Sequence, residues 1–485
     1  MMRYLIPFVA SMVWLAPVKV FAQGEADILR PESVLEASAE HFPEILKGMA
    51  LQRGAEAGVL EAQGAFDLVF DGEGFSRVDG FYDGTAVAGK ARQRFRNYGG
   101  EYYAGYKISN GTFPIYEDIW YTNTGGTLSV GALFALLRDR EIDDDRYAAT
   151  DARLAKRQAD LDLLLTRIGV QQRALMAYWD WVAVGRKLAV YEDLLLIATQ
   201  RQVGLTEEVR RGARAEFFLT ENQQNITRRQ TLVTVSRRDF MIAANNLGFY
   251  FRDGQGRPQQ PSQAQLPPVR PVTAWNEPGE LPITTAGEAL DRRPELARLR
   301  NTIDRVRNEI QLVENDLKPR LDFGVEMQQG LGAVAEGGPS RDSFDAILAM
   351  KFSVPFQQRE TRGRLLRAEA ELEAKQQEKR LQQERIELQV RNILLELAFA
   401  RQLLQLAAAE AQQSAVIRDA EIKRFQSGAS DFFLVNVREE TAANARVKFH
   451  DAELTTRIAR ATYDAAVVDY ERLGLGHLVT GAMGR

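Results

Sequence analysis

Cysteine is absent from the 485-residue sequence, and histidine occurs only three times. Without cysteine the chain can form no disulfide and can carry no lipid on an N-terminal cysteine. A metal site needs converging ligands, whereas His41, His450 and His477 are scattered through the sequence. We therefore predict no metal site, and no residue pattern points to another cofactor.

A basic excess and a long apolar segment are also lacking. The chain has 62 basic and 66 acidic residues, a net charge of −4, which gives no general attraction to nucleic acid. Beyond residue 22 no run of about 18 apolar residues occurs, so any membrane contact would have to be made by strands. No phosphate-binding loop or nucleophile elbow is present. The sequence therefore offers no catalytic residues and does not predict an enzyme.

The first 22 residues are typical of a secretory signal peptide. Arg3 supplies a positive start, residues 4–18 form a mostly apolar run, and Val20-Phe21-Ala22 fits a cleavage site before Gln23. The alternative is an N-terminal membrane anchor. Two prolines and a lysine interrupt the short run, which favours a cleaved signal and an exported protein.

Internal repetition is the most informative feature that is present. Glu216-Phe217-Phe218-Leu219 recurs as Asp431-Phe432-Phe433-Leu434, and each tetrapeptide follows a glycine-alanine pair. Two shorter motifs recur as well, Pro43-Glu44 as Pro294-Glu295 and Arg140-Glu141 as Arg359-Glu360. We predict two repeats, residues 23–251 and 286–475, with a tail at 476–485. The connector at 252–285 is rich in proline, which excludes regular helix there.

Each repeat is predicted to contain a first helix, two strands, a very long helix, a glycine tip and a returning helix. The expected helices are 33–64, 138–207 and 215–249 in the first repeat, and 286–318, 357–425 and 431–472 in the second. About 69 residues of helix span roughly 100 Å, so one long helix can lie beside two shorter helices stacked end to end. Two apolar seams run along 357–425, which suits packing on both sides. One seam is Leu365, Leu372, Ile386 and Ile393, and the other is Leu381, Leu388 and Leu395.

The clearest strand is predicted at residues 320–328, where an apolar and a polar face alternate. This period of two is typical of a barrel strand between lipid and water, although an amphipathic hairpin on a soluble core has the same pattern. The predicted membrane-facing residues are Leu321, Phe323, Val325 and Met327, and the predicted lumen-facing residues are Asp322 and Glu326. Further strands are expected at 344–356, 66–71 and 127–137. Four strands cannot close a barrel, so several chains must contribute.

An insert rich in tyrosine and glycine lies between roughly Phe75 and Thr127. Two interpretations stay open for it, an enlarged outward loop or additional strand length, because aromatic residues also mark membrane interfaces.

The repeated order of elements, the paired motifs and the alanine-spaced helix that follows Gly428 resemble the TolC-like outer-membrane efflux and type I secretion channels. The resemblance implies a mainly α protein with a small β part, in which duplicated long-helix hairpins form a periplasmic α-barrel. It also implies a homotrimer in which each protomer contributes four strands to a shared 12-stranded transmembrane β-barrel in the lipid bilayer of the outer membrane. The implied function is a passive exit duct that works with a periplasmic adaptor and an inner-membrane transporter. The alternative is a periplasmic adaptor or helical-hairpin interaction protein without its own pore.

Charged residues gather at the two glycine tips. The candidate tip residues are Arg210, Arg211, Gly212, Arg214 and Glu216, with Arg424, Gln426, Gly428 and Asp431. They could narrow a tunnel mouth or dock an adaptor, since rings of charge set selectivity in pores. They could equally be solvated helix ends. The resemblance implies an aspartate six residues after the tip glycine, but Leu434 occupies that position, so the family's gate residue is not expected here. The tip phenylalanines are interpreted as packing.

Overall fold

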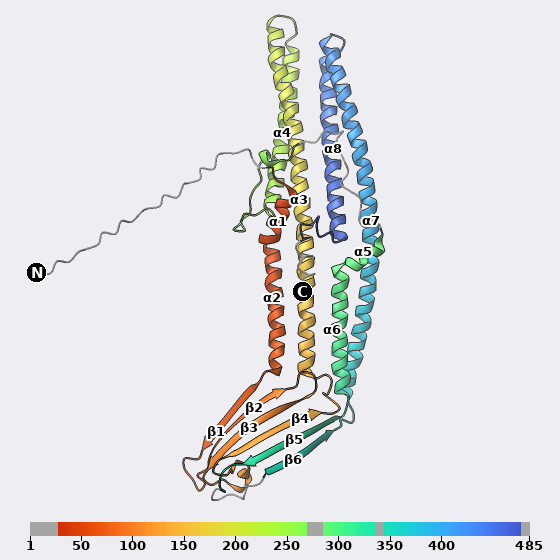
Figure 1. Ribbon diagram of the computed structural model, residues 1–485. Coiled ribbons are helices and arrows are strands. Elements are labelled where there is room, and N and C mark those ends of the chain that lie inside the picture. The colour runs from red at the N-terminus through yellow and green to blue at the C-terminus, as the bar shows by residue number, and fades with distance from the viewer. Residues whose placement is uncertain (1–27, 269–284, 335–343, 477–485) are drawn as a thin grey trace, which may run out of the picture.

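The computed structural model describes residues 28–268, 285–334 and 344–476, which form an elongated molecule with a sheet at one end and two helical tips at the other (Figure 1). The expected signal peptide, much of the connector and most of the C-terminal tail lie outside the described residues. The two long helices are α3 (Asp144–Arg210) and α7 (Arg359–Gln426), with 67 and 68 residues. Each spans about 100 Å, as the sequence predicts.

Shorter helices are stacked in two columns beside the long ones. Helix α3 contacts α1 (Pro31–His41), α2 (Pro43–Gln63) and α4 (Phe217–Gly248). Helix α7 contacts α5 (Ala286–Arg292), α6 (Pro294–Asp316) and α8 (Phe432–Ala466). The two repeats are joined because α3 also contacts α6 and α8. None of the helices in the described ranges has an apolar stretch long enough to cross a bilayer.

The first helix of each repeat is broken by proline, which corrects the continuous helices expected at 33–64 and 286–318. Pro43 and Pro294 each begin a new helix, and the residues before them, Phe42 and Arg293, are extended. Steric conflict with a following proline disfavours the helical conformation, while proline itself suits the first helical position. The repeated proline-glutamate pair therefore marks the same kink twice.

Within the described residues the sheet has six strands, not four. It is antiparallel throughout, in the order β1-β2-β3-β4-β5-β6. The strands are β1 (Val69–Ser76), β2 (Thr85–Arg94), β3 (Gly100–Asn110), β4 (Thr127–Ala135), β5 (Arg320–Gly330) and β6 (Phe344–Ser353). The insert forms strands β2 and β3. Of the two interpretations left open for it, additional strand length is therefore right and an enlarged outward loop is not. Phe66 ends a short 3₁₀ helix (Gly64–Phe66) instead of starting a strand.

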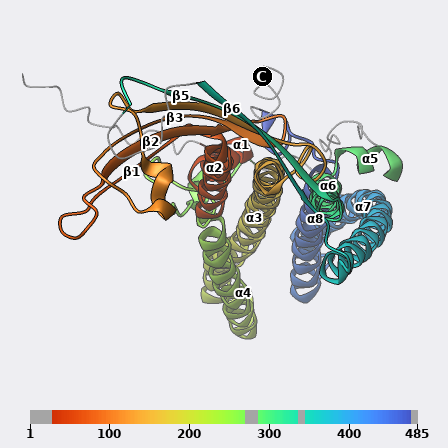
Figure 2. The same ribbon diagram turned by 90° about the horizontal axis from the view of Figure 1, so that it is seen from below.

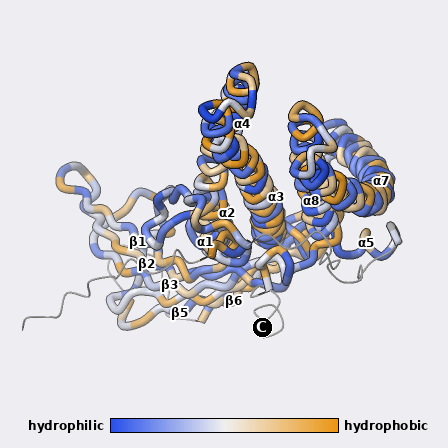
Figure 3. The backbone as a smooth tube through the Cα atoms, turned by 90° about the horizontal axis from the view of Figure 1, so that it is seen from above, coloured by the Kyte–Doolittle hydropathy of each residue, from blue (hydrophilic) through white to orange (hydrophobic). Residues whose placement is uncertain are grey.

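The first repeat supplies four strands and the second supplies two, and the pairing of β4 with β5 joins the repeats. Figure 2 shows the curved sheet lying across the ends of the helices. The largest cluster of buried apolar side chains lies in the middle of the rod, around Tyr178 and Trp181 of α3. Elsewhere hydrophobic and hydrophilic residues are interspersed along the helices (Figure 3).

Candidate functional site

Both tips turn on a glycine with the same backbone geometry. Gly212 and Gly428 have φ angles of 73° and 78°, a left-handed conformation that costs other residues free energy. In each tip the following alanine donates its N–H to a carbonyl of the last helical turn, Ala213 to Glu208 and Ala429 to Arg424. These bonds satisfy carbonyls that the end of a helix leaves free.

The tip charges bond within their own tip. Arg210 and Arg211 pair with Glu207, and Arg214 pairs with Glu208. In the second tip Arg424 lies 3.5 Å from Glu421. Gln426 and Glu216 are exposed. Within the described residues no ion pair joins one charge cluster to the other.

Asp431 has a structural task. Its carboxylate accepts a 2.6 Å hydrogen bond from the backbone N–H of Leu434 and so caps α8. The matching residue in the first tip, Glu216, makes no such cap at the start of α4. The two acidic residues are therefore equivalent in sequence but not in structure.

Aromatic side chains join the two tips to each other. Phe218 and Phe432 meet edge to face with ring centroids 6.1 Å apart. The guanidinium of Arg214 lies 5.4 Å from the ring of Phe218 and 5.0 Å from that of Phe425, distances at which cation–π attraction operates. Arg214 is the only predicted tip charge placed between the tips in the described structure.

The repeated pairs of phenylalanines divide into two roles. Phe432 is buried, whereas Phe217 and Phe433 are 68% and 66% exposed. The interpretation of these side chains as packing therefore fits Phe218 and Phe432 but not their exposed neighbours.

Below the tips, a buried ion-pair network that the sequence analysis missed links three helices. Glu439 of α8 is 1% exposed and receives Arg201 of α3 and Arg229 of α4. Arg229 also donates to the carbonyl of Leu194 at 2.8 Å, and burial lowers the pKa of its guanidinium. A buried charge of this kind is tolerated only when it is paired and hydrogen-bonded, so Glu439 holds the two repeats together.

A second buried pair lies deeper in the rod. Arg186 of α3 donates to Glu453 of α8 at 2.6 Å, and Nδ1 of His450 lies 3.7 Å from the same carboxylate. Burial raises the pKa of Glu453, but His450 and the charge of Arg186 outweigh it and lower the pKa to about 2. The carboxylate is therefore held in its charged form.

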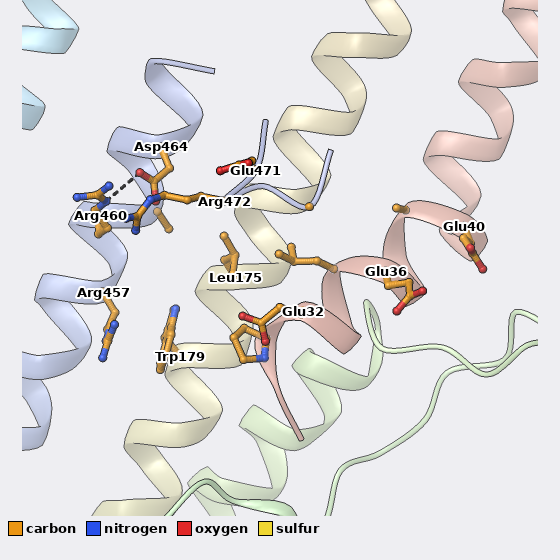
Figure 4. A pocket seen from close by; sticks show the side chains of 15 residues that line it. Glu32, Glu36, Glu40, Leu175, Trp179, Arg457, Arg460, Asp464, Glu471 and Arg472 are labelled. Carbon is orange, nitrogen blue, oxygen red and sulfur yellow. Dashed lines mark hydrogen bonds and ion pairs between the residues drawn. The ribbon is translucent and has the colours of Figure 1, made fainter. Parts of the chain in front are cut away.

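A charged hollow of about 860 Å³ lies where α1, α3, α8 and the turn after α8 meet. Figure 4 shows Glu32, Glu36 and Glu40 along α1 and the arginines of α8 on the other side. The arginines already have partners. Arg460 is 2.8 Å from Asp464, and Arg457 lies 4.4 Å from the centre of the Trp179 ring. Burial raises the pKa of Asp464 to about 6. We assign no ligand to this hollow.

The sheet separates the predicted membrane-facing and lumen-facing residues. The four apolar residues of β5 share one face with the residues directly opposite them on β6, Phe352, Met350, Leu348 and Ala346. Asp322 and Glu326 lie on the other face. Asp322 is 5% exposed and pairs with Arg320 at 2.7 Å, so its carboxylate is buried in the single chain. Glu326 accepts a hydrogen bond from Tyr103 at 2.7 Å.

No cluster of three or more potential metal-ligating side chains occurs among the described residues. The predicted site residues therefore lie in two places, the tips and the sheet, at opposite ends of the rod (Figure 1).

Solved structures with the same fold are outer-membrane channels. The transmembrane channel CusC matches with a TM-score of 0.63 and 11% identity over 93% of this chain and 95% of CusC. MtrE of Neisseria gonorrhoeae, in its open state, matches with a TM-score of 0.62 and 14% identity over 90% and 88%. VceC of Vibrio cholerae matches with a TM-score of 0.60 and 14% identity over 90% and 95%. No curated protein matches in sequence.

Residues 285–471 match the family of outer membrane efflux proteins. The second repeat thus carries an outer membrane efflux protein domain, and the whole chain has the fold of the TolC-like channels. The resemblance seen in the sequence is confirmed. The domain matched in the second repeat and the fold of the whole chain both point to an outer-membrane efflux channel, and nothing favours the alternative of an adaptor without a pore.

Proposed function

We propose that three copies of this chain form a continuous passive exit duct across the periplasm and the outer membrane. The observation that supports a multimer most directly is the second apolar seam of α7. Ile386 and Ile393 of the first seam are buried within the chain, whereas Leu388 and Leu395 of the second are 61% and 57% exposed. The exposed seam continues through Phe399, Leu403 and Leu406. A row of apolar side chains of this length on a solvent-exposed face of a helix is typical of an interaction surface. The neighbouring copy would cover it.

The mass of the detergent-extracted protein from isolated outer membranes tests this proposal. We expect a trimer, and we expect Leu395→Glu to yield monomers because it places a charge in the seam. Glu396→Gln, one residue along on the exposed side, is the matched control and should remain trimeric. A monomeric wild-type protein in the periplasmic fraction would contradict the duct.

The tips are proposed to dock a periplasmic adaptor that connects the duct to an inner-membrane transporter. Phe217 and Phe433 belong to the repeated tetrapeptides of the two tips, lie at the same end of the rod and are exposed beside exposed charges of both signs. Exposed aromatic residues surrounded by polar groups are typical centres of protein interfaces. The charged tip residues would then surround the contact and set its orientation.

Efflux by a strain that lacks the chromosomal copy tests the docking assignment. We expect Phe217→Ala with Phe433→Ala to keep the trimer but to lower resistance to exported toxic compounds by about tenfold, the loss expected for a removed interface anchor. Leu51→Ala, a residue of α2 that is 62% exposed, is the control and should leave resistance unchanged. Unchanged resistance in the double variant would remove the docking role of the phenylalanines and leave the channel intact.

We also propose that the chain itself catalyses no reaction and uses no cofactor. Its contribution is a water-filled path, and the energy for transport would come from the partner transporter.

A further inference from the structure

The sheet of one chain has two open edges. Strands β1 and β6 each pair with a neighbour on one side only, and within the described residues no segment covers their outer edges. Open edges are prone to pair with other chains, and closing the sheet into a barrel removes them. Because each neighbouring pair is antiparallel, β1 and β6 run in opposite directions, so β6 of one copy can add β1 of the next in the same antiparallel pattern.

We propose that three copies close an 18-stranded barrel by pairing β6 of each copy with β1 of the next, in the register that sets Lys351 opposite Asp71. This rests on the proposed trimer. It replaces the 12-stranded barrel that the resemblance implies, because the described part of each chain contributes six strands. The extra hairpin β2–β3 then lies in the barrel wall and makes the membrane part wider.

The stagger of the sheet supports this register. A line drawn across the strands from Val69 reaches Ile347, passing through Arg92, Tyr103, Gly131 and Glu326. Ile347 lies six residues before Ser353, which ends β6 on the helical side. If Ser353 faces Val69 of the next copy, the strand register is offset by six residues for every six strands around the barrel.

A shift of one residue per strand gives an ordinary barrel. An eight-stranded barrel with a shear of eight has the same stagger, and its strands tilt by about 36°, within the roughly 35–45° of membrane barrels. A register two residues shorter would reduce the tilt to roughly 27°, because tilt and stagger are linked. A register two residues longer would keep an acceptable tilt but would bring Asp345 beside Asp79, in the turn after β1, instead of Arg77, and like charges close to each other repel.

Charges on the polar face match in the proposed register. Lys351 faces Asp71, and six residues away Asp345 faces Arg77. Within the described residues Lys351 and Asp345 form no ion pair. Lys351 also lies opposite Asp322 on its own β5, and Asp322 pairs with Arg320. Asp71 and Arg77 likewise pair with Arg92 and Glu117 of their own chain. The neighbouring copy therefore adds an opposite charge beside each of the two β6 charges, to be shared with these existing pairs.

The apolar face matches by shape. Strand β1 presents Gly72 and Gly74 there, beside a shallow hollow of about 510 Å³ that Phe70 and Val87 help to line. In the proposed register the exposed side chains of Met350 and Leu348 face these two glycines. Large side chains of β6 would thus pack over the small residues of β1, and Phe352 would lie opposite Phe70.

Disulfide trapping in the cysteine-free chain tests the register. Residues directly opposite on antiparallel strands have Cα atoms about 4.5–5.5 Å apart, within reach of a disulfide. We expect purified Lys351→Cys with Asp71→Cys to form covalent trimers on mild oxidation. Lys351→Cys with Glu73→Cys tests the longer register, and Lys351→Cys with Tyr103→Cys tests a 12-stranded closure in which β3 is the edge. Both of these pairs should stay monomeric on denaturing gels.

The outcomes separate the barrel from the duct. If the protein before oxidation is not trimeric, the proposed function fails. If it is trimeric but crosslinks through Glu73→Cys, through Tyr103→Cys or through no pair, the inference alone is overturned. Gly72→Leu is a second variant, because a Cβ at Gly72 meets nothing in its own chain closer than 3.8 Å. We expect at least a tenfold loss of heat-resistant trimer from it, and no loss from Ala132→Leu in the middle of the same face. Equal behaviour of the two variants would also overturn the inference.

Discussion

The two repeats share a helical plan but differ in the charges they turn towards each other. Across the seam between α3 and α4 of the first repeat and α8 of the second, the first repeat mostly supplies arginine or lysine and the second mostly supplies glutamate or aspartate. The pairs in this direction include Arg186–Glu453, Lys187–Asp451, Arg228–Glu440 and Arg229–Glu439, and Arg446–Asp193 runs the other way. The two repeats therefore keep the same arrangement of helices, whereas the charges that attract them to each other differ between the repeats.

The largest expected effect comes from breaking the buried part of this seam. Glu439→Gln leaves Arg201 and Arg229 without their countercharge, which should cost about 3–5 kcal/mol. Hydrogen exchange of the amides in the middle of α8 should then speed up by roughly a hundredfold or more. Glu440→Gln is the matched control, since its pair with Arg228 is half exposed and should contribute less than about 1 kcal/mol. Equal exchange in the two variants would show that the seam is not held by buried charge.

The pair at Glu453 should make the same seam sensitive to acid. Its folded pKa of about 2 lies below the ordinary value of 4.5, so its stabilisation is present above pH 4.5 and is lost as pH falls towards 2. The full difference is about 3 kcal/mol. We expect thermal stability to fall over this window in the wild type and to fall less in Glu453→Gln. Asp451→Asn, whose carboxylate is 50% exposed, should keep the wild-type profile, and a parallel fall in both variants would assign the acid sensitivity to other groups.

The helical plan could be predicted because it depends on local pattern. The spacing of apolar residues and the two glycine tips predict the long helices, and the alternation of apolar and polar residues predicts β5. The breaks at Phe42 and Arg293 were also predictable, since a residue before proline resists helix, but the repeated motif was interpreted as part of a continuous helix.

The remaining features depend on contacts that the sequence does not display. Strand β2 is built largely from alanine, glycine and basic residues, which have weak strand propensity, and it is stabilised by pairing with β1 and β3. Glu439 and Arg229 resemble solvated helical charges until the fold brings residues 210 positions apart together. The predicted tip residues lie at the two turns between helices, but which phenylalanine is buried and which acid caps a helix depends on how the two tips pack against each other.

The smallest expected effect tests whether the repeats are still equivalent at their tips. Gly212→Ala and Gly428→Ala should each cost about 1 kcal/mol, because both glycines have positive φ and an added Cβ meets nothing within 4 Å at either. Exchange of the last-turn amides of α3 and α7 should then accelerate about fivefold in each variant. Gly204→Ala, in the interior of α3 with equally open surroundings, should instead stabilise the helix by about 1 kcal/mol. Unequal costs at the two tips would mean that the contacts of Arg214 with Phe218 and Phe425 stabilise one turn more than the other. The two repeats would then differ in structure at the tips, as they already do in the number of strands that they supply to the sheet.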